Sequence, residues 1–224
     1  GLVKQKRISE AQIEAAVRPI LEMKIRLGLF EHPYADVTKI AKIANAPEHR
    51  KLARIAAQRT VVLLKNTKNI LPLSKEGSVA VIGPLANSSA DMTSFWAGQA
   101  AYKENVTFLQ GIKNKLGASA QVDYAQGVQI TRTIPSFFDA IMQRKPVEKW
   151  SKAQEEEEYA QALELAKRSD RVVMVLGELA SMSGELGSQS NIELPGNQQR
   201  LLEDIASLDK PLVLIVVSGR PINI

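Results

Sequence analysis

Residues 171–219 read RVVMVLGELASMSGELGSQSNIELPGNQQRLLEDIASLDKPLVLIVVSG and contain two continuous apolar runs. The runs Val172–Leu176 and Leu212–Val217 are typical of strands that are covered on both faces, as in a parallel sheet. Between them, residues 197–208 have the apolar spacing of a helix. A strand, a helix and a second strand in this order indicate an α/β layer with parallel strands.

The residues before this stretch continue the same alternation. Strands are predicted at 78–83 and 120–127, and helices at 108–117 and 152–168. The helix at 152–168 has acidic residues in its first turns and basic residues in its last turn, which suits the helix dipole. Residues 131–150 have no regular pattern. The predicted fold class is therefore α/β, a layered α/β sandwich with a mostly parallel sheet.

The first quarter of the chain has a different, mostly helical pattern. Residues 9–27 have an apolar helical stripe, and Ser9 with Gln12 forms a capping-box pattern at its start. Pro19 falls inside the stripe, so we expect either a kink or two shorter helices there. Residues 47–59 predict another helix, and TVVLLKN at 60–66 predicts a short strand because it begins with β-branched residues.

Composition excludes several classes of protein. The 224 residues are enough for one large domain or one domain with an appendage, and the net charge of +5 is scattered along the chain, which argues against a nucleic-acid partner. The chain has no cysteine, which excludes disulfides and thiolate zinc sites, and its two histidines have no spacing that suggests a metal site. No apolar run is long enough to span a membrane. We expect both ends to be cut from a longer protein.

Glycines follow two of the predicted strands, which raises the question of a phosphate-binding loop. VIGPLAN and VLGELASMSGE do not match G-x-G-x-x-G, and no P-loop pattern occurs in the chain. Pro84 also removes an N–H group that a phosphate cradle would use. A nucleotide-binding α/β domain is therefore the weakest of the functional alternatives.

Three glutamates lie in the polar loop after the predicted strand Val172–Leu176. Glu178 comes directly after the strand, where backbone N–H groups or a neighbouring base would hold it. Glu185 stands between Gly184 and Gly187, which allow tight backbone conformations. Glu193 alternates with apolar residues and is expected to face solvent. Hydrolysis of a glycosidic bond needs two carboxyl groups, and this loop could supply one of them.

Trp96, in SFWAG, follows the first predicted strand of the sheet. Parallel strands place the loops after their carboxyl ends along one edge, so this tryptophan is expected at the same edge as the three glutamates. Core packing is one interpretation of Trp96. The other is a sugar-binding residue, because an indole face stacks well on the C–H face of a pyranose.

Several segments, in this order and spacing, resemble one family. They are RISEAQIEAAVRPILEMKIRLGLFEHPY, AAQRTVVLLKN with ILPL, VAVIGPLAN, MSGELGSQSNIELPGNQ and KPLVLIVVSGRPINI. Together they resemble the family 3 glycoside hydrolases, especially the bacterial β-glucosidases. The resemblance implies that residues 1–35 are the tail of a (β/α)8 barrel, residues 36–77 a linker with a helix, and residues 78–224 a C-terminally truncated α/β sandwich domain.

The resemblance also implies a function. Glu185 matches the family's catalytic acid/base, Trp96 matches a residue that faces the sugar, and the nucleophile would be an aspartate of the barrel, outside this chain. The implied enzyme is a retaining exo-β-glucosidase that acts on β-glucosides or oligosaccharides in the periplasm or outside the cell. It would use no metal or organic cofactor, and the chain alone would be inactive. Gln189 and Asn191 replace the arginine and aspartate of many members. A non-catalytic carbohydrate-binding or interaction module on the same fold is the alternative.

Overall fold

The computed structural model describes the whole chain except residues 45, 94–95, 98–104, 132–147 and 186. The chain divides into two compact units, Gly1–Lys65 and Asn66–Ile224. The limits 1–35, 36–77 and 78–224, predicted for a barrel tail, a linker and a sandwich domain, remain a prediction. No helix in the described part of the chain combines the length and the apolar character that a membrane span requires.

The first unit is helical. It contains α1 (Glu10–Arg26), the 3-10 helix η1 (Val37–Lys39), α2 (Ile40–Ile43) and α3 (Pro47–Thr60). The predicted capping box is present, since Ser9 N donates to Gln12 Oε1 at 2.8 Å and Gln12 N donates to Ser9 Oγ at 3.2 Å. Helix α1 is continuous across Pro19, so the expectation of two shorter helices is wrong.

The predicted strand at 60–66 is also wrong. Thr60 is the last residue of α3, and residues 61–66 belong to no helix or strand. The β-branched start of this segment gave the strand signal, but no strand among the described residues pairs with it. The side chains of the Val61–Leu64 segment are between 65% and 81% exposed. The 3-10 helix η2 (Thr67–Asn69) is the first element of the second unit.

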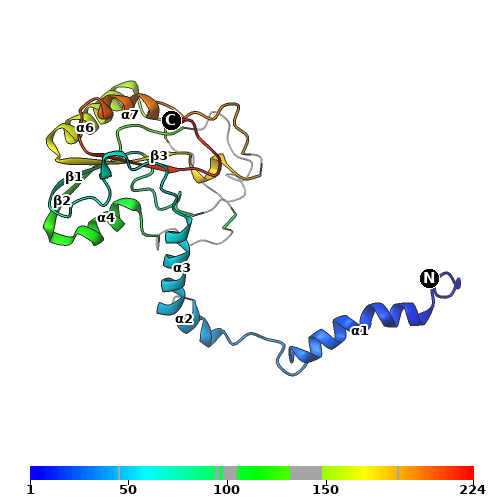
Figure 1. Cartoon of the computed structure of the whole chain (residues 1–224). Coiled ribbons are helices and arrows are strands. Elements are labelled where there is room, and N and C mark those ends of the chain that lie inside the picture. The colour runs from blue at the N-terminus through cyan, green and yellow to red at the C-terminus, as the bar shows by residue number, and fades with distance from the viewer. Residues whose placement is uncertain (45, 94–95, 98–104, 132–147, 186) are drawn as a thin grey trace. The chain divides into compact units, whose positions relative to one another are not determined.

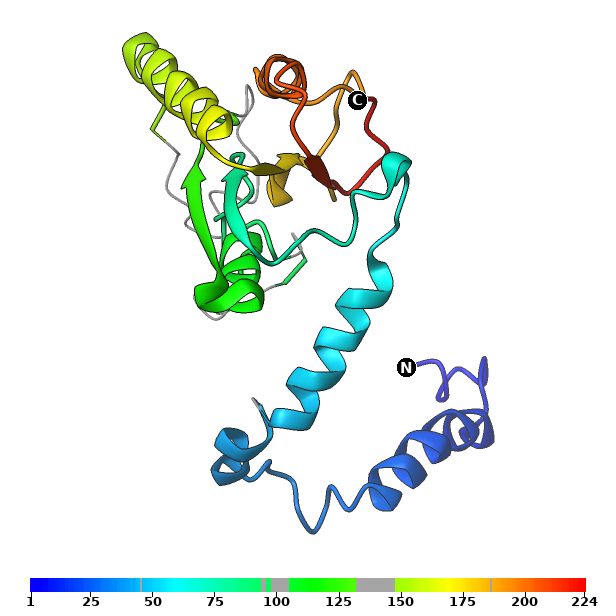
Figure 2. The same ribbon diagram turned by 60° about the vertical axis from the view of Figure 1, so that its left-hand side comes forward.

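The second unit is built around a four-stranded parallel sheet with the strand order β2-β1-β3-β4. Figures 1 and 2 show the sheet and its helices from two sides. Along the chain, the elements of this unit are β1 (Gly77–Ile82), α4 (Phe108–Leu116), η4 (Gly117–Ser119), β2 (Ala120–Ala125), α6 (Lys152–Arg168), β3 (Arg171–Gly177), η5 (Ala180–Met182), α7 (Gln198–Ala206) and β4 (Leu212–Val217). The predicted α/β class and the parallel sheet are confirmed.

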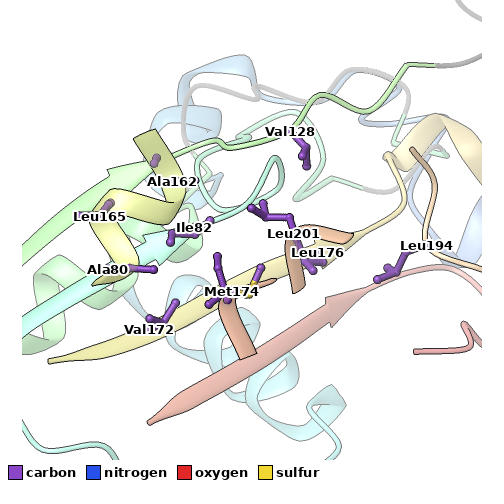
Figure 3. Packing of buried hydrophobic residues seen from close by; sticks show 13 residues of the cluster. Ala80, Ile82, Val128, Ala162, Leu165, Val172, Met174, Leu176, Leu194 and Leu201 are labelled. Carbon is purple, nitrogen blue, oxygen red and sulfur yellow. The ribbon is translucent and has the colours of Figure 1, made fainter. Parts of the chain in front are cut away.

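Helices cover both faces of the sheet, and the alternation of the strand residues decides which face each side chain joins. Ala80, Ile82, Val172, Met174 and Leu176 pack with residues of α6 and α7, as Figure 3 shows. The alternate strand residues pack on the other face with α4 and with the segment after β1. That second cluster comprises Val79, Val81, Leu85, Ala86, Leu109, Ile130, Val173, Val175 and Met182. The central strands β1 and β3 are therefore buried on both sides.

Strand β4 departs from the expectation for a covered strand. All six residues of Leu212–Val217 are only half-buried. The reason is position, because β4 lies at an edge of the described sheet and pairs with β3 alone. Most of the segment predicted to be irregular, 131–150, lies outside the described residues.

Candidate functional site

The loop that follows β3 lies beside the segments that follow β1 and β4 (Figure 1). Glu178 N donates to Val217 O at 2.9 Å, and Ala180 N donates to Asp91 Oδ1 at 2.8 Å. These bonds join the β3 loop to the end of β4 and to the loop after β1. The prediction that the loops after the strands at 78–83 and 171–177 lie at the same end of the sheet is confirmed.

Glu178 is a buried carboxylate with two side-chain donors. Only 6% of the residue is exposed, and its Oε2 accepts from Ser218 Oγ at 2.8 Å and from Arg220 Nε at 3.1 Å. The expectation that a neighbouring base holds Glu178 is therefore confirmed. A buried carboxylate paired in this way is costly to disturb, because removing one partner leaves a charge uncompensated. This arrangement suits a structural ion pair.

Arg220 connects this ion pair to the part of the loop that carries Glu185. Its Nη2 donates to Met182 O and, at 2.7 Å, to Gly187 O. These carbonyls lie on the two sides of Glu185 along the chain. Gly187 N also donates to Gly184 O at 3.1 Å, which closes a tight turn around Glu185.

Glu185 and Glu193 are both exposed, in contrast to the buried Glu178. The prediction that Glu193 faces solvent is confirmed. No side chain in the part of the chain that the structure describes pairs with Glu185. The three glutamates therefore have three different environments: one in a buried ion pair, one on a held turn, and one on an exposed strand-like segment that bridges to Asn223.

Gln198, the first residue of α7, closes the base of the same loop. Its Oε1 accepts from Gly177 N at 2.9 Å, and its Nε2 donates to Gly177 O and to Pro195 O, each at 2.8 Å. The residue is fully buried. Leu194 of the loop joins the core beside Leu176, as Figure 3 shows. The base of the loop, where it leaves β3 and enters α7, is thus fixed by the Gln198 amide and by the packing of Leu194.

A pocket of about 340 Å³ opens where these loops meet. Trp96 lies in its wall and is 62% exposed, so the core-packing interpretation of this residue is wrong. On the β3 loop, the lining includes Ser183 and Gly184, and Glu185 follows directly. The described lining residues are Asp91, Met92, Thr93, Trp96, Glu178, Leu179, Ala180, Ser183, Gly184, Val217, Ser218 and Gly219.

A larger cavity, of about 550 Å³, lies between α4 and residues 71–75. Its described lining is mostly apolar and contains no carboxylate. Its titratable lining groups are Lys75 and Lys115, whereas the smaller pocket is lined by Asp91 and Glu178 and borders Glu185. Hydrolysis of a glycosidic bond, the reaction expected from the sequence, needs carboxyl groups. The smaller pocket is therefore the better candidate for a catalytic site.

The glycines at the ends of β1 and β3 have a packing role. A Cβ atom on Gly83 would lie 2.2 Å from Val175 O, and one on Gly177 would lie 1.9 Å from Val217 O. Both have positive φ angles, 128° and 138°, which side-chain-bearing residues rarely adopt. These contacts explain both glycines without a bound phosphate. The described residues also contain no group of three His, Cys, Asp or Glu that could hold a metal ion.

Sequence reasoning missed Arg220, Ser218 and Gln198. A signal for Arg220 existed, because it comes three residues after one predicted strand and Glu178 comes directly after another, and a parallel sheet brings the carboxyl ends of its strands to one edge. Gln198 gave no such signal. Its role depends on the main-chain groups of Gly177, which no side-chain pattern reveals.

An α/β domain with a loop carboxylate at the carboxyl edge of its parallel sheet is compatible with many activities, so comparison with known proteins decides the class. Residues 61–224 match the glycosyl hydrolase family 3 C-terminal domain. The match covers most of the chain, and the chain belongs to this family. The predicted resemblance is confirmed.

The relatives include enzymes of two sugar specificities. The chain is 36% identical to the periplasmic β-glucosidase of Salmonella typhimurium, over 99% of this chain and 30% of that protein. It is 31% identical to a β-xylosidase of Formosa agariphila, over 95% of this chain and 27% of that protein. The glucose complex of a Listeria innocua β-glucosidase superposes with a TM-score of 0.74 at 29% identity, over 99% of this chain and 27% of that one. The chain thus spans less than a third of these proteins.

Proposed function

We propose that this chain supplies the acid/base carboxylate of a retaining exo-β-glucosidase, and that Glu185 is that carboxylate. The observation that carries the proposal is the contrast within one loop. Glu185 is exposed on a turn whose flanking carbonyls are fixed, next to a pocket, whereas Glu178 is buried in an ion pair. A group that transfers protons must reach the substrate, and an exposed carboxylate that directly follows a pocket-lining residue suits this role.

The chemistry follows the two-step retaining mechanism. A second carboxylate, an aspartate from the part of the enzyme that lies outside this chain, attacks the anomeric carbon while Glu185 gives its proton to the departing oxygen. In the second step Glu185 takes a proton from water, the water oxygen bonds to the anomeric carbon, and the aspartate leaves. The product has the β configuration of the substrate. The two carboxyl groups must lie about 5 Å apart in such enzymes.

Trp96 is proposed as a sugar-contacting residue of the same site. Its large exposed surface in the pocket wall suits stacking on a pyranose ring. A terminal β-D-glucosyl residue is the proposed substrate group, supported by the higher identity to the Salmonella β-glucosidase than to the Formosa β-xylosidase. Comparing the kcat/KM of nitrophenyl β-D-glucoside and β-D-xyloside in the full-length enzyme tests this point. A preference for the xyloside would replace the glucosyl assignment.

The acid/base assignment is tested with Glu185→Ala in the full-length enzyme. Glucosides with poorly acidic leaving groups should lose about 10²- to 10⁴-fold in kcat/KM, because they depend on proton donation. Aryl glucosides with very acidic phenols should lose far less in the glycosylation step. Azide should restore turnover on those activated substrates, because a small anion needs no general base, and the product should be the β-glucosyl azide.

Glu193→Ala is the matched control, since it removes an exposed glutamate from the same loop. It should leave the dependence on leaving-group acidity unchanged and show no azide rescue. The assignment is refuted if Glu185→Ala lowers all substrates by one factor, or if Glu193→Ala shows the rescue instead.

The 224-residue chain alone is proposed to be inactive, because one carboxylate of the pair is outside it. Incubation of the purified chain with an aryl β-glucoside should give no turnover above that of buffer. The non-catalytic alternative predicts in addition that the full-length protein is inactive, and an assay of both proteins separates the two.

A further inference from the structure

The guanidinium of Arg220 binds Glu178 and the turn around Glu185 through different nitrogen atoms. Nε binds Glu178 Oε2 at 3.1 Å, while Nη2 binds Gly187 O at 2.7 Å and also Met182 O. The two carbonyls come three residues before and two residues after Glu185. Both stems of the turn that carries Glu185 are therefore attached to one planar cation.

The orientation of this cation is itself fixed. Glu178 Oε2 also accepts from Ser218 Oγ at 2.8 Å, and Arg220 N donates to the same hydroxyl at 3.2 Å. The Glu178 side chain is 5% exposed and that of Arg220 is 24% exposed, so water competes little for these bonds. An arginine fork has its donors in a fixed plane, and a lysine could not bind the carboxylate and both carbonyls in the same geometry.

Close backbone packing gives the turn little room to move relative to Arg220. A Cβ atom on Gly219, the residue before Arg220, would lie 2.4 Å from Ser183 Oγ. A Cβ on Gly187 would lie 2.9 Å from the carbonyl carbon of Ser183. The segment after β4 is thus in direct contact with Ser183 at the start of the turn, so we expect a displacement of Arg220 to shift the residues around Glu185.

We propose that Arg220, aligned by the buried Glu178, is a positioning residue that sets the direction in which the turn presents the carboxyl group of Glu185. This inference rests on the proposed function of Glu185. It assigns the buried glutamate of the loop, whose side chain is only 5% exposed, a role in the reaction that is exerted through Arg220. Neither residue exchanges a proton with the sugar, and both act through the backbone carbonyls of Met182 and Gly187.

The test is Arg220→Met in the full-length enzyme, which keeps the length of the side chain and removes the fork. With glucosides of poorly acidic leaving groups, kcat/KM should fall about 10- to 100-fold, a part of the general-acid contribution. With glucosides of acidic phenols it should fall less than about threefold, because these substrates need little protonation. Arg220→Lys should recover only a small part of the loss. Arg200→Met, on the exposed surface of α7, should change neither class of substrate.

A double-mutant cycle with Glu185→Ala decides whether Arg220 acts through Glu185. In the Glu185→Ala background, Arg220→Met should have almost no further effect on poor leaving groups. Equal losses in both backgrounds, or a loss that is the same for every leaving group, would overturn the proposal. If Glu185→Ala itself shows no dependence on leaving-group acidity, the acid/base assignment fails instead, and the two failures are distinguished.

If Arg220→Met does not fold, Glu178→Gln carries the same test, because it keeps the shape and removes the charge that orients the guanidinium. Its kcat/KM should fall in the same leaving-group-dependent way, by a smaller factor than that of Arg220→Met. An unchanged dependence in a folded Glu178→Gln enzyme, verified by circular dichroism, would overturn the proposal.

Discussion

Replacing Gln198 by methionine removes the amide clamp at the base of the β3 loop while nearly keeping its volume. Gln198 is fully buried, and its amide makes three hydrogen bonds of 2.8–2.9 Å to the main chain of Gly177 and Pro195. Each buried polar group left without a partner costs about 1–3 kcal/mol. The apolar methionine side chain recovers part of this by favourable burial. We therefore expect a net loss of about 2–4 kcal/mol in the free energy of unfolding.

Urea unfolding of the 224-residue chain, followed by circular dichroism, measures this loss. With a typical m value of about 2 kcal/mol per molar urea, the midpoint should fall by about 1–2 M. Gln199→Met is the matched control, because the Gln199 amide bonds to Glu203 within α7 and to no other residue that the structure describes. It should change stability by less than about 0.5 kcal/mol. Equal midpoints for the two variants would refute the clamp.

Three further predictions concern the scaffold. Gly83→Ala should destabilise the chain by more than about 4 kcal/mol, because its Cβ would clash with a carbonyl oxygen of the neighbouring strand. Gly111→Ala in α4 is the control and should stabilise the chain by about 0.5–1 kcal/mol, since no heavy atom would lie closer than 4.0 Å to its Cβ; thermal melts compare the two variants. Hydrogen bonds from Ser78 N and Oγ lower the pKa of Asp170, so the stability that Asp170 contributes is present above the unfolded pKa near 3.8 and is lost as the pH falls through the folded pKa. Asp170→Asn should therefore lower the Tm at pH 7 more than at pH 3. Burial, and then the hydrogen bond to Asp204, raise the pKa of Tyr159 to about 12. The contribution of Tyr159 to folding stability is therefore lost as the pH rises from 10 to 12, and Tyr159→Phe should reduce the fall in Tm over this pH range.

The sheet and its helices could be predicted because their signals are local. The apolar run of β3 and the acid-first, base-last pattern of α6 each determine an element without reference to the rest of the chain. The segment 60–66 failed for the complementary reason. Its β-branched residues suit a strand, but a strand needs a neighbour with free main-chain groups, and a local pattern cannot say whether one is within reach.

The candidate site was only partly predictable. Glu185 and Trp96 could be chosen from residue type, position after a strand, and resemblance. The support of Glu185 could not, because it depends on the carbonyls of Met182 and Gly187, and every residue has a carbonyl. Arg220 is separated from these carbonyls by more than 30 residues in the chain, and only the parallel pairing of β3 with β4 brings them together.

The two supports of the loop differ in chemistry, and the difference has a consequence for sequence variation. Gln198 binds main-chain groups at the base, and Arg220 binds main-chain carbonyls at the turn, so neither support uses a side chain of residues 183–193. Gln189 and Asn191 are exposed, so substitutions at these positions should not loosen either anchor. A loop fixed through its backbone can keep its carboxylate in place while the side chains around that carboxylate change. Changes at 189 and 191 should therefore leave both anchors of the loop intact, whereas changes at 178, 198 or 220 should weaken one of them.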